Sequence, residues 1–197
     1  MKKVLKALGI FLAILILVIA IFYYKNNETL PIGTEGKEAD NLATKMLTAL
    51  NYEAYKNAEY LEWSFRSTQF YKWNIPENIV TVTWGNNEIL LDTKKQENSK
   101  VIKSAKNIKN EKLIEKASDY FNNDSFWLIA PFKVFDSGVK RSIVKHNGSD
   151  ALLVTYTSGG STPGDSYLWI LDKKGFPISY KMWVGIIPIG GIEASWS

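Results

Sequence analysis

The sequence predicts an α+β protein, in which two or three helices cover an antiparallel sheet and one transmembrane helix precedes both. Three observations carry this prediction. An unbroken run of 18 uncharged, mostly apolar residues, Ala7–Tyr24, follows Lys2, Lys3 and Lys6. Two later segments repeat their apolar residues at helical spacing, and most of the remaining chain alternates with period two between turn signals.

The apolar run predicts an N-terminal membrane anchor. A helix of 18 residues extends about 27 Å, close to the thickness of a bilayer's hydrocarbon core, and the three lysines favour a cytoplasmic N-terminus. The alternative is a cleaved signal peptide, but the run ends in bulky residues where a peptidase needs small ones. We therefore expect residues 1–25 to be an uncleaved anchor. Residues 4–24 would contact the bacterial inner membrane, and the C-terminal domain would lie on the periplasmic side.

Breaker residues suggest that residues 26–37 are a polar linker, and that residues 38–197 form one β-rich domain. All 20 acidic residues lie beyond the anchor, whereas three of the 24 basic residues precede the apolar run. The exported part is therefore close to neutral. A nucleic-acid partner would want a strongly basic face, so we expect no nucleic acid.

The composition limits the available chemistry. The chain has no cysteine, which excludes disulfides, thiol catalysis, cysteine metal sites and a lipid-modified N-terminal cysteine. His146 is the only histidine, so a histidine metal cluster is disfavoured. We expect no metal and no cofactor.

Apolar periodicity predicts the helices. Ala39, Leu42, Ala43, Met46, Leu47 and Leu50 recur at helical spacing and predict an amphipathic helix over 37–50. A short helical or turn segment follows to Ala58. The second amphipathic helix is expected over 110–122, with Asn110 as its cap.

Alternation predicts the strands of an antiparallel meander. Turn signals separate them, such as Gly85-Asn86-Asn87, Asn147-Gly148, the glycine-rich segment 158–164, and Lys173-Lys174-Gly175. The expected strands are 60–66, 70–73, 79–84, 88–92, 141–145, 150–157, 166–172, 178–184 and 189–196.

Several of these strands are apolar on both faces, so each side of the sheet needs a cover. Helices can supply one cover, and sheet curvature, a lid or an apolar ligand could supply the other. Large aromatic side chains are abundant on the same strands. Each can be ordinary core, but as a group they also suit a concave apolar site. The candidate ligand-binding residues are Trp63, Phe65, Trp84, Trp127, Phe132, Trp169, Met182 and Trp183.

Residues 94–116 carry eight lysines and only three acidic residues. This pattern fits a patch for anionic lipid headgroups, but it is more typical of a solvated strand, loop and helix face.

No motif supports catalysis. His146 precedes Asn147-Gly148, which predicts a hairpin tip rather than a catalytic base. Four carboxylates near strand ends could serve glycoside hydrolysis, but nothing in the sequence pairs them. Two of these four, Asp165 and Asp172, are predicted to be turn residues. We therefore expect no catalytic residue and no enzymatic activity. The four carboxylates are Asp136, Asp165, Asp172 and Glu193.

Two segments, Asn123–Lys133 and Asp165–Pro177, carry a family resemblance. They resemble a Bacteroidetes envelope-protein family that is related in design to the outer-membrane lipoprotein carriers LolA and LolB. The resemblance spans residues 37–196. It implies a LolA-like fold: a strongly curved antiparallel sheet, an unclosed half-barrel, whose concave apolar face is covered by helices and holds acyl chains.

Two functions follow as expectations. The first is a membrane-tethered protein that binds a lipid or lipoprotein acyl chain, or another apolar ligand, in envelope lipid or lipoprotein handling. The alternative is an interaction or sensor module with a closed core, whose partner is another envelope protein.

Overall fold

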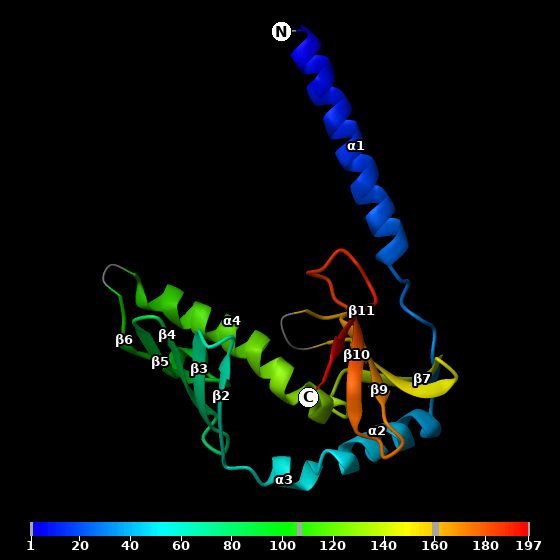
Figure 1. Cartoon of the computed structure of the whole chain (residues 1–197). Coiled ribbons are helices and arrows are strands. Elements are labelled where there is room, and N and C mark those ends of the chain that lie inside the picture. Colours follow the sequence, from blue (N-terminus) through cyan, green and yellow to red (C-terminus); the bar gives the residue numbers. More distant parts are fainter. Residues whose placement is uncertain (1, 106–107, 159–161, 197) are drawn as a thin grey trace. The chain divides into compact units, whose positions relative to one another are not determined.

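The computed structural model describes residues 2–105, 108–158 and 162–196, except for the side chains of residues 2, 3, 5 and 7. The chain divides into two units (Figure 1). Unit 1 contains Met1–Ala49 and Val134–Ser197, and unit 2 contains Leu50–Lys133. The predicted α+β class with antiparallel pairing is confirmed. The prediction of one curved sheet was wrong, because the described strands form two sheets, and no closed barrel occurs among them.

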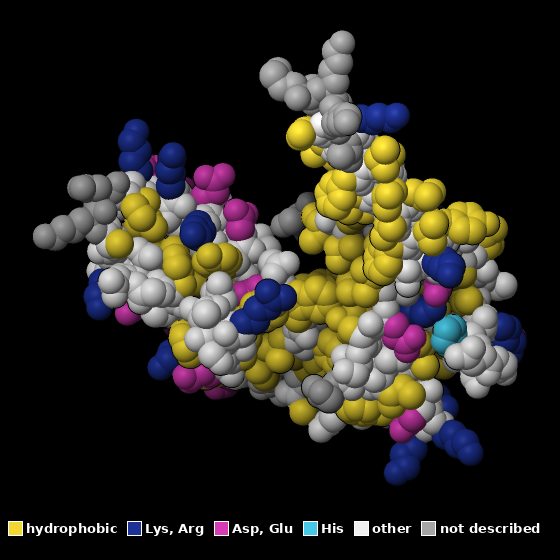
Figure 2. Space-filling model, turned by 45° about the horizontal axis from the view of Figure 1, so that its top comes forward, with side chains coloured by type: hydrophobic (Ala, Val, Ile, Leu, Met, Phe, Trp, Pro, Cys, Tyr) yellow, Lys and Arg dark blue, Asp and Glu magenta, His cyan; other side chains and the backbone are white. Residues whose placement is uncertain are grey.

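Helix α1 (Lys2–Asn26) contains the apolar run. From Leu8 to Asn26 it is long and apolar enough to cross a membrane, and none of this stretch is buried. Figure 2 shows apolar side chains along its length. A membrane-spanning helix and an N-terminal signal sequence share these properties.

Unit 1 is built on a six-stranded antiparallel sheet in the order β1-β7-β8-β9-β10-β11. Strand β1 is a two-residue edge strand. Its pairing of Thr34 with Ile143 was not predicted, because two residues show no periodicity. The strands are β1 (Thr34–Glu35), β7 (Val139–His146), β8 (Ser149–Tyr156), β9 (Ser166–Leu171), β10 (Pro177–Trp183) and β11 (Ile192–Ser195).

Helix α2 (Lys37–Ala49) covers one face of this sheet, as its predicted periodicity indicates. The side chains of Ala39, Ala43 and Met46 are fully buried. Arg141 on β7 also binds the helix, because its Nε donates to Asp40 Oδ1 at 2.6 Å. The guanidinium also donates to the carbonyl of Val134. Burial of small and medium apolar side chains thus holds α2 in place, and one ion pair sets its register.

The opposite face of the sheet is covered by chain that was predicted to be linker. We call residues 27–35 the strap. The carboxylate of Glu28 accepts two hydrogen bonds from Lys181 Nζ, at 2.6 and 2.7 Å. The indole of Trp183 donates to the carbonyl of Glu28 at 2.8 Å. Lys181 and Trp183 share a face of β10 because they are two residues apart.

Further hydrogen bonds and one close contact hold the strap on unit 1. Glu28 N donates to Gly190 O at 3.0 Å, and Gly190 N donates to Asn27 Oδ1 at 2.8 Å. At Gly33, an added Cβ would lie 2.4 Å from Ser142 Oγ, so the strap passes too close to β7 for a side chain there. These contacts therefore hold the residues that directly follow α1 against the sheet of unit 1.

Unit 2 is a five-stranded antiparallel meander in the order β2-β3-β4-β5-β6. Strand β6 lies in the lysine-rich stretch, where a solvated strand, loop and helix face were expected without bounds for the strand. The strands are β2 (Tyr60–Phe65), β3 (Gln69–Asn74), β4 (Ile79–Trp84), β5 (Asn87–Asp92) and β6 (Lys100–Lys103), and a 3₁₀ turn, η1 (Gln96–Asn98), precedes β6.

Helix α4 (Asn110–Ile129) packs on this meander (Figure 1). It is longer than the predicted 110–122, because it continues through the segment that carries part of the family resemblance. Asn110 is its first helical residue. Lys109 occupies the cap position without a side-chain hydrogen bond, so the prediction of an Asn110 cap was wrong. Unit 2 also contains α3 (Tyr52–Lys56) and the 3₁₀ turn η2 (Ala130–Lys133).

We predict that strong alkali destabilises unit 1. Burial raises the pKa of Tyr156 and of Tyr167, and the neighbouring Asp165 raises that of Tyr167 further. A raised pKa in the folded state means that the stabilising contribution is complete below the unfolded value near 10, and is lost as the pH rises above it. Urea unfolding followed by tryptophan fluorescence at about pH 8 and about pH 11 measures this loss.

The control is Tyr167→Phe, which keeps the ring and removes one titrating group. Its loss of stability between the two pH values should be smaller than that of the wild type. An equal loss in both proteins would contradict the role of Tyr167.

Candidate functional site

The eight residues predicted to line a ligand site divide between the two units. Five belong to unit 2 and three to unit 1, so neither unit carries the whole predicted set. In unit 2 they are Trp63, Phe65, Trp84, Trp127 and Phe132, and in unit 1 Trp169, Met182 and Trp183.

In unit 2 the strand aromatics pack as core between the meander and α4. The rings of Trp63 and Tyr71 stack at 4.6 Å, and Trp73 meets Phe121 edge-on at 5.1 Å. Trp84 is 9% exposed and contacts this same cluster, as does Phe65. These geometries are typical of packed aromatic pairs, so the rings fill the space that a ligand would need.

Two indole groups of this cluster are enclosed without a hydrogen-bond partner among the described residues. They are the Nε1 groups of Trp63 and Trp73. An enclosed N–H without a partner costs about 1–3 kcal/mol. These two indoles therefore contribute to stability through ring packing and not through hydrogen bonds of their Nε1 groups.

One polar pair does lie within the core of unit 2. The hydroxyl of Tyr71 donates to Asp124 Oδ2, and Asn123 Nδ2 donates to Asp124 Oδ1 at 2.8 Å. Tyr71 is fully buried and Asp124 is 3% exposed. Burial, together with the bonded carboxylate, raises the pKa of Tyr71 well above its ordinary value. The tyrosine therefore stays neutral and serves as a donor that joins the meander to α4.

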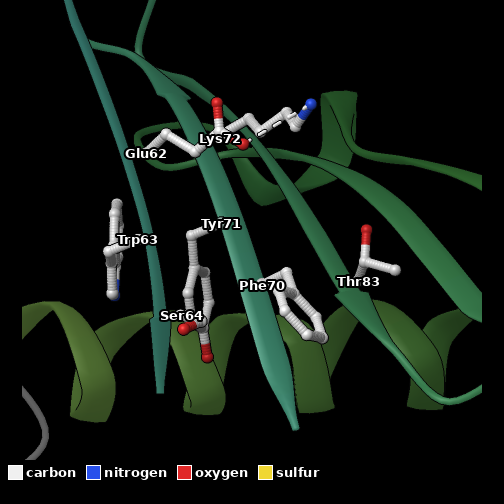
Figure 3. Close-up of a pocket in the computed structure, with 7 residues that line it drawn as sticks. All are labelled: Glu62, Trp63, Ser64, Phe70, Tyr71, Lys72 and Thr83. Atoms are coloured by element: carbon white, nitrogen blue, oxygen red, sulfur yellow. Dashed lines mark ion pairs between the residues drawn. The ribbon is translucent and has the colours of Figure 1, made fainter. Parts of the chain in front are cut away.

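A polar depression of about 270 Å³ lies over β2, β3 and β4 (Figure 3). Glu62 and Lys72 point away from α4, whereas Trp63 and Tyr71 point toward it. The Glu62–Lys72 pair is 3.6 Å long and its side chains are more than half exposed. Exposed pairs contribute roughly 0–1 kcal/mol to stability, so the Glu62–Lys72 pair adds little to the stability of unit 2. Its lining residues are Glu62, Trp63, Ser64, Phe70, Tyr71, Lys72 and Thr83.

A second depression, of about 290 Å³, is almost entirely apolar. We call it the α3–α4 groove, because α3 and the C-terminal part of α4 with η2 supply most of its walls. Tyr55 and Phe132 stack at 4.3 Å with their planes 5° apart. Tyr52 adds a further ring 6.3 Å from Phe132. The lining residues are Leu50, Asn51, Ala54, Tyr55, Ala58, Leu61, Leu128, Ile129 and Phe132.

Of the eight predicted site residues, Phe132 is the one that lines this groove, and Trp127 lies on the same stretch of α4 with its ring edge-on to Phe126. The sequence analysis missed the other lining residues. Ala54, Tyr55 and Ala58 repeat at helical spacing, which could have indicated one wall of the groove. Nothing local in the sequence places that wall beside the end of α4.

In unit 1, two of the three predicted residues lie within the core. Trp169 is 1% exposed and meets Tyr180 and Trp196 at 5.3 and 5.2 Å. Met182 is 9% exposed on the same strand as Tyr180. Trp183 lies on the other face, packs against a small apolar cluster and donates to the strap. All three therefore have structural contacts that account for them.

The candidate catalytic groups lie in several turns and strands of unit 1. His146 ends β7 at a hairpin whose turn residues Asn147 and Gly148 both have positive φ, so the predicted hairpin tip is confirmed. Asp172 accepts the backbone N–H groups of its own turn, as predicted. Asp165 closes a turn, as predicted, since its N–H donates to Thr162 O at 3.3 Å, and its buried side chain accepts from Gly185 N at 2.8 Å.

Glu193 accepts from Ser179 Oγ at 2.8 Å on the neighbouring strand. Asp136 lies in the segment between η2 and β7. Within residues 2–105, 108–158 and 162–196, no group of three His, Asp or Glu side chains could hold a metal ion.

The lysine-rich stretch is divided among η1, β6 and the first turns of α4. Its described lysines are exposed, which fits the solvated face that the composition favours. Lys106 and part of the glycine-rich segment, residues 159–161, lie outside the described residues.

Comparisons with protein-family models, with curated protein sequences and with solved structures find no match. The resemblance to the LolA and LolB carriers therefore remains a prediction from sequence.

We predict that Tyr71→Phe destabilises unit 2 by about 1–3 kcal/mol, because it leaves Asp124 Oδ2 buried without its donor. The measurement is the free energy of unfolding in urea. The matched control is Tyr60→Phe on the neighbouring strand, where the ring is half exposed and a loss below about 0.5 kcal/mol is expected. Equal stability of the two variants would show that the Tyr71–Asp124 bond contributes nothing.

Proposed function

We propose that this chain is a non-catalytic, membrane-tethered binding protein of the bacterial envelope, whose α3–α4 groove receives the acyl chain of a lipid. The observation that carries the proposal is the lining of the groove. A stacked aromatic pair forms part of the wall, and the remaining lining residues are apolar apart from Asn51.

The apolar lining supports an apolar ligand on energetic grounds. Covering such a surface contributes about 25 cal/mol per Å² before the costs of association. Ligand sites of small molecules are typically concave and mostly apolar, with few polar groups. Here the side chains of Asn51 and Tyr55 are the only polar ones in the lining, which favours a hydrocarbon chain over a polar headgroup.

The anchor supports a lipid as the source of that chain. Helix α1 is exposed and apolar, and Tyr23 and Tyr24 lie near its end, where aromatic side chains favour the membrane–water interface. With the lysines before it in the cytoplasm, the helix would place both units on the outer side of the inner membrane. A tethered protein would then meet lipids or lipoproteins at its own membrane and would not shuttle between membranes.

A second function is favoured by the aromatic packing. Val80, Val82 and Ile89 are fully buried in the same cluster as the rings of Trp63, Phe65 and Trp84, which were predicted to hold a ligand. A closed core of this kind suits an interaction or sensor module whose partner is another envelope protein. In that case the groove would accept apolar side chains of the partner.

We predict that a photoactivatable fatty acid labels the groove of the full chain in phospholipid nanodiscs. Ala54→Phe should lower this labelling about tenfold, a loss of ~1.4 kcal/mol in binding, because the added ring fills the groove. The control is Glu53→Phe, which places the same ring on α3 outside the lining and should leave labelling unchanged. The labelled peptides are identified by mass spectrometry.

Labelling of α1 serves as an internal standard, because a membrane-embedded helix meets the fatty acid in every variant. Wild-type labelling confined to α1 would overturn the acyl-chain proposal. Co-purification of one defined envelope protein, lost in Ala54→Phe, would then support the second function.

A further inference from the structure

The loop between β10 and β11 is apolar and exposed. From Val184 to Ile189 it carries no charged side chain, and four of its six residues are isoleucine or valine. Ile186 is 73% exposed and Pro188 is also exposed, whereas Val184 is buried and Ile187 and Ile189 are partly buried. A single exposed apolar side chain is ordinary on a protein surface, so the position of this tip in the fold decides its interpretation.

The same loop is fixed at the end of α1. Gly190, near its C-terminal end, exchanges hydrogen bonds with Asn27 and Glu28, the first two residues after the helix. At Gly191, an added Cβ would lie 2.6 Å from Glu28 Cβ, so the contact is close. The C-terminal end of the loop is therefore hydrogen-bonded to the residues at which the chain would leave the bilayer.

The distance from Gly190 to the exposed tip of the loop is short. Ile186 is four residues from Gly190, which is at most about 14 Å of extended chain. The interfacial layer on each side of a bilayer is roughly 5–8 Å thick. Two strap residues add to the apolar surface: Leu30 is 44% exposed and Ile32 is 99% exposed. If α1 crosses the membrane, the exposed tip of the loop therefore lies close enough to the interface to contact lipid.

We propose that the exposed tip of the β10–β11 loop, with Ile186 and Pro188, inserts into the outer leaflet of the membrane that α1 crosses, and thereby forms a second membrane contact of unit 1. This inference rests on the proposed anchoring by α1. Burial of Ile186 and its neighbours contributes favourably, at about 25 cal/mol per Å². Two contacts, the helix and the loop, would restrict the rotation of unit 1 about the helix axis.

The absence of cysteine from the chain makes the test direct, because each introduced cysteine is the only labelling position. An environment-sensitive fluorophore is placed on Ile186→Cys, on Tyr24→Cys as a positive control and on Phe176→Cys as a negative control. Phe176 is 40% exposed in the turn at the opposite end of β10. The full chain is reconstituted in phosphatidylcholine vesicles, with or without phosphatidylcholine that carries a nitroxide on its acyl chain.

The expected result is strong quenching of the probe at 186, comparable with that at 24, and no quenching at 176. Quenching at 24 with none at 186 would overturn the loop inference and leave the anchor intact. If the probe at 24 is not quenched and alkaline carbonate extracts the chain from the vesicles, both the anchor and the loop inference fail.

Discussion

The attachment of Glu28 to β10 is the constraint on which the placement of unit 1 depends. Its carboxylate accepts from Lys181, its carbonyl accepts from Trp183, and its N–H donates to Gly190. Each such bond contributes only about 0.5–1.5 kcal/mol, but together they hold one residue from three directions. Because Glu28 is two residues beyond α1, this attachment joins the sheet of unit 1 to the chain directly after the helix.

Because of this attachment, the residues that follow α1 do not act as a free linker. A free linker of twelve residues would reach roughly 40 Å from the membrane. A docked strap instead brings the sheet of unit 1 to the end of the helix, with Thr34 and Glu35 completing its edge. The polar composition of the segment concealed this role, because Asn27 and Glu28 bind through side-chain and backbone polar atoms that carry no hydrophobic pattern.

Much of the secondary structure could be predicted from periodicity, since burial on one face imposes a period on each strand and amphipathic helix. Strand β4 and helix α2 follow the predicted ranges closely. The division into two sheets could not be predicted, because apolar alternation shows that a strand has a buried face but not which strands it pairs with. For the same reason, Trp63 and Trp169 were assigned to one site although they belong to different units. Phe132 lies at the candidate groove, and the helical spacing of Ala54, Tyr55 and Ala58 indicates one of its walls. Nothing local in the sequence shows that Tyr55 stacks on Phe132.

Amide hydrogen exchange of the full chain in phospholipid nanodiscs tests most directly whether the strap is bound to the sheet of unit 1. The amide of Glu28 should exchange much more slowly than that of Ile32, whose side chain is fully exposed on the same strap. Lys181→Ala should accelerate exchange at Glu28 severalfold, because it removes the partner of the Glu28 carboxylate. Exchange of Glu28 as fast as that of Ile32 in the wild-type protein would contradict the account.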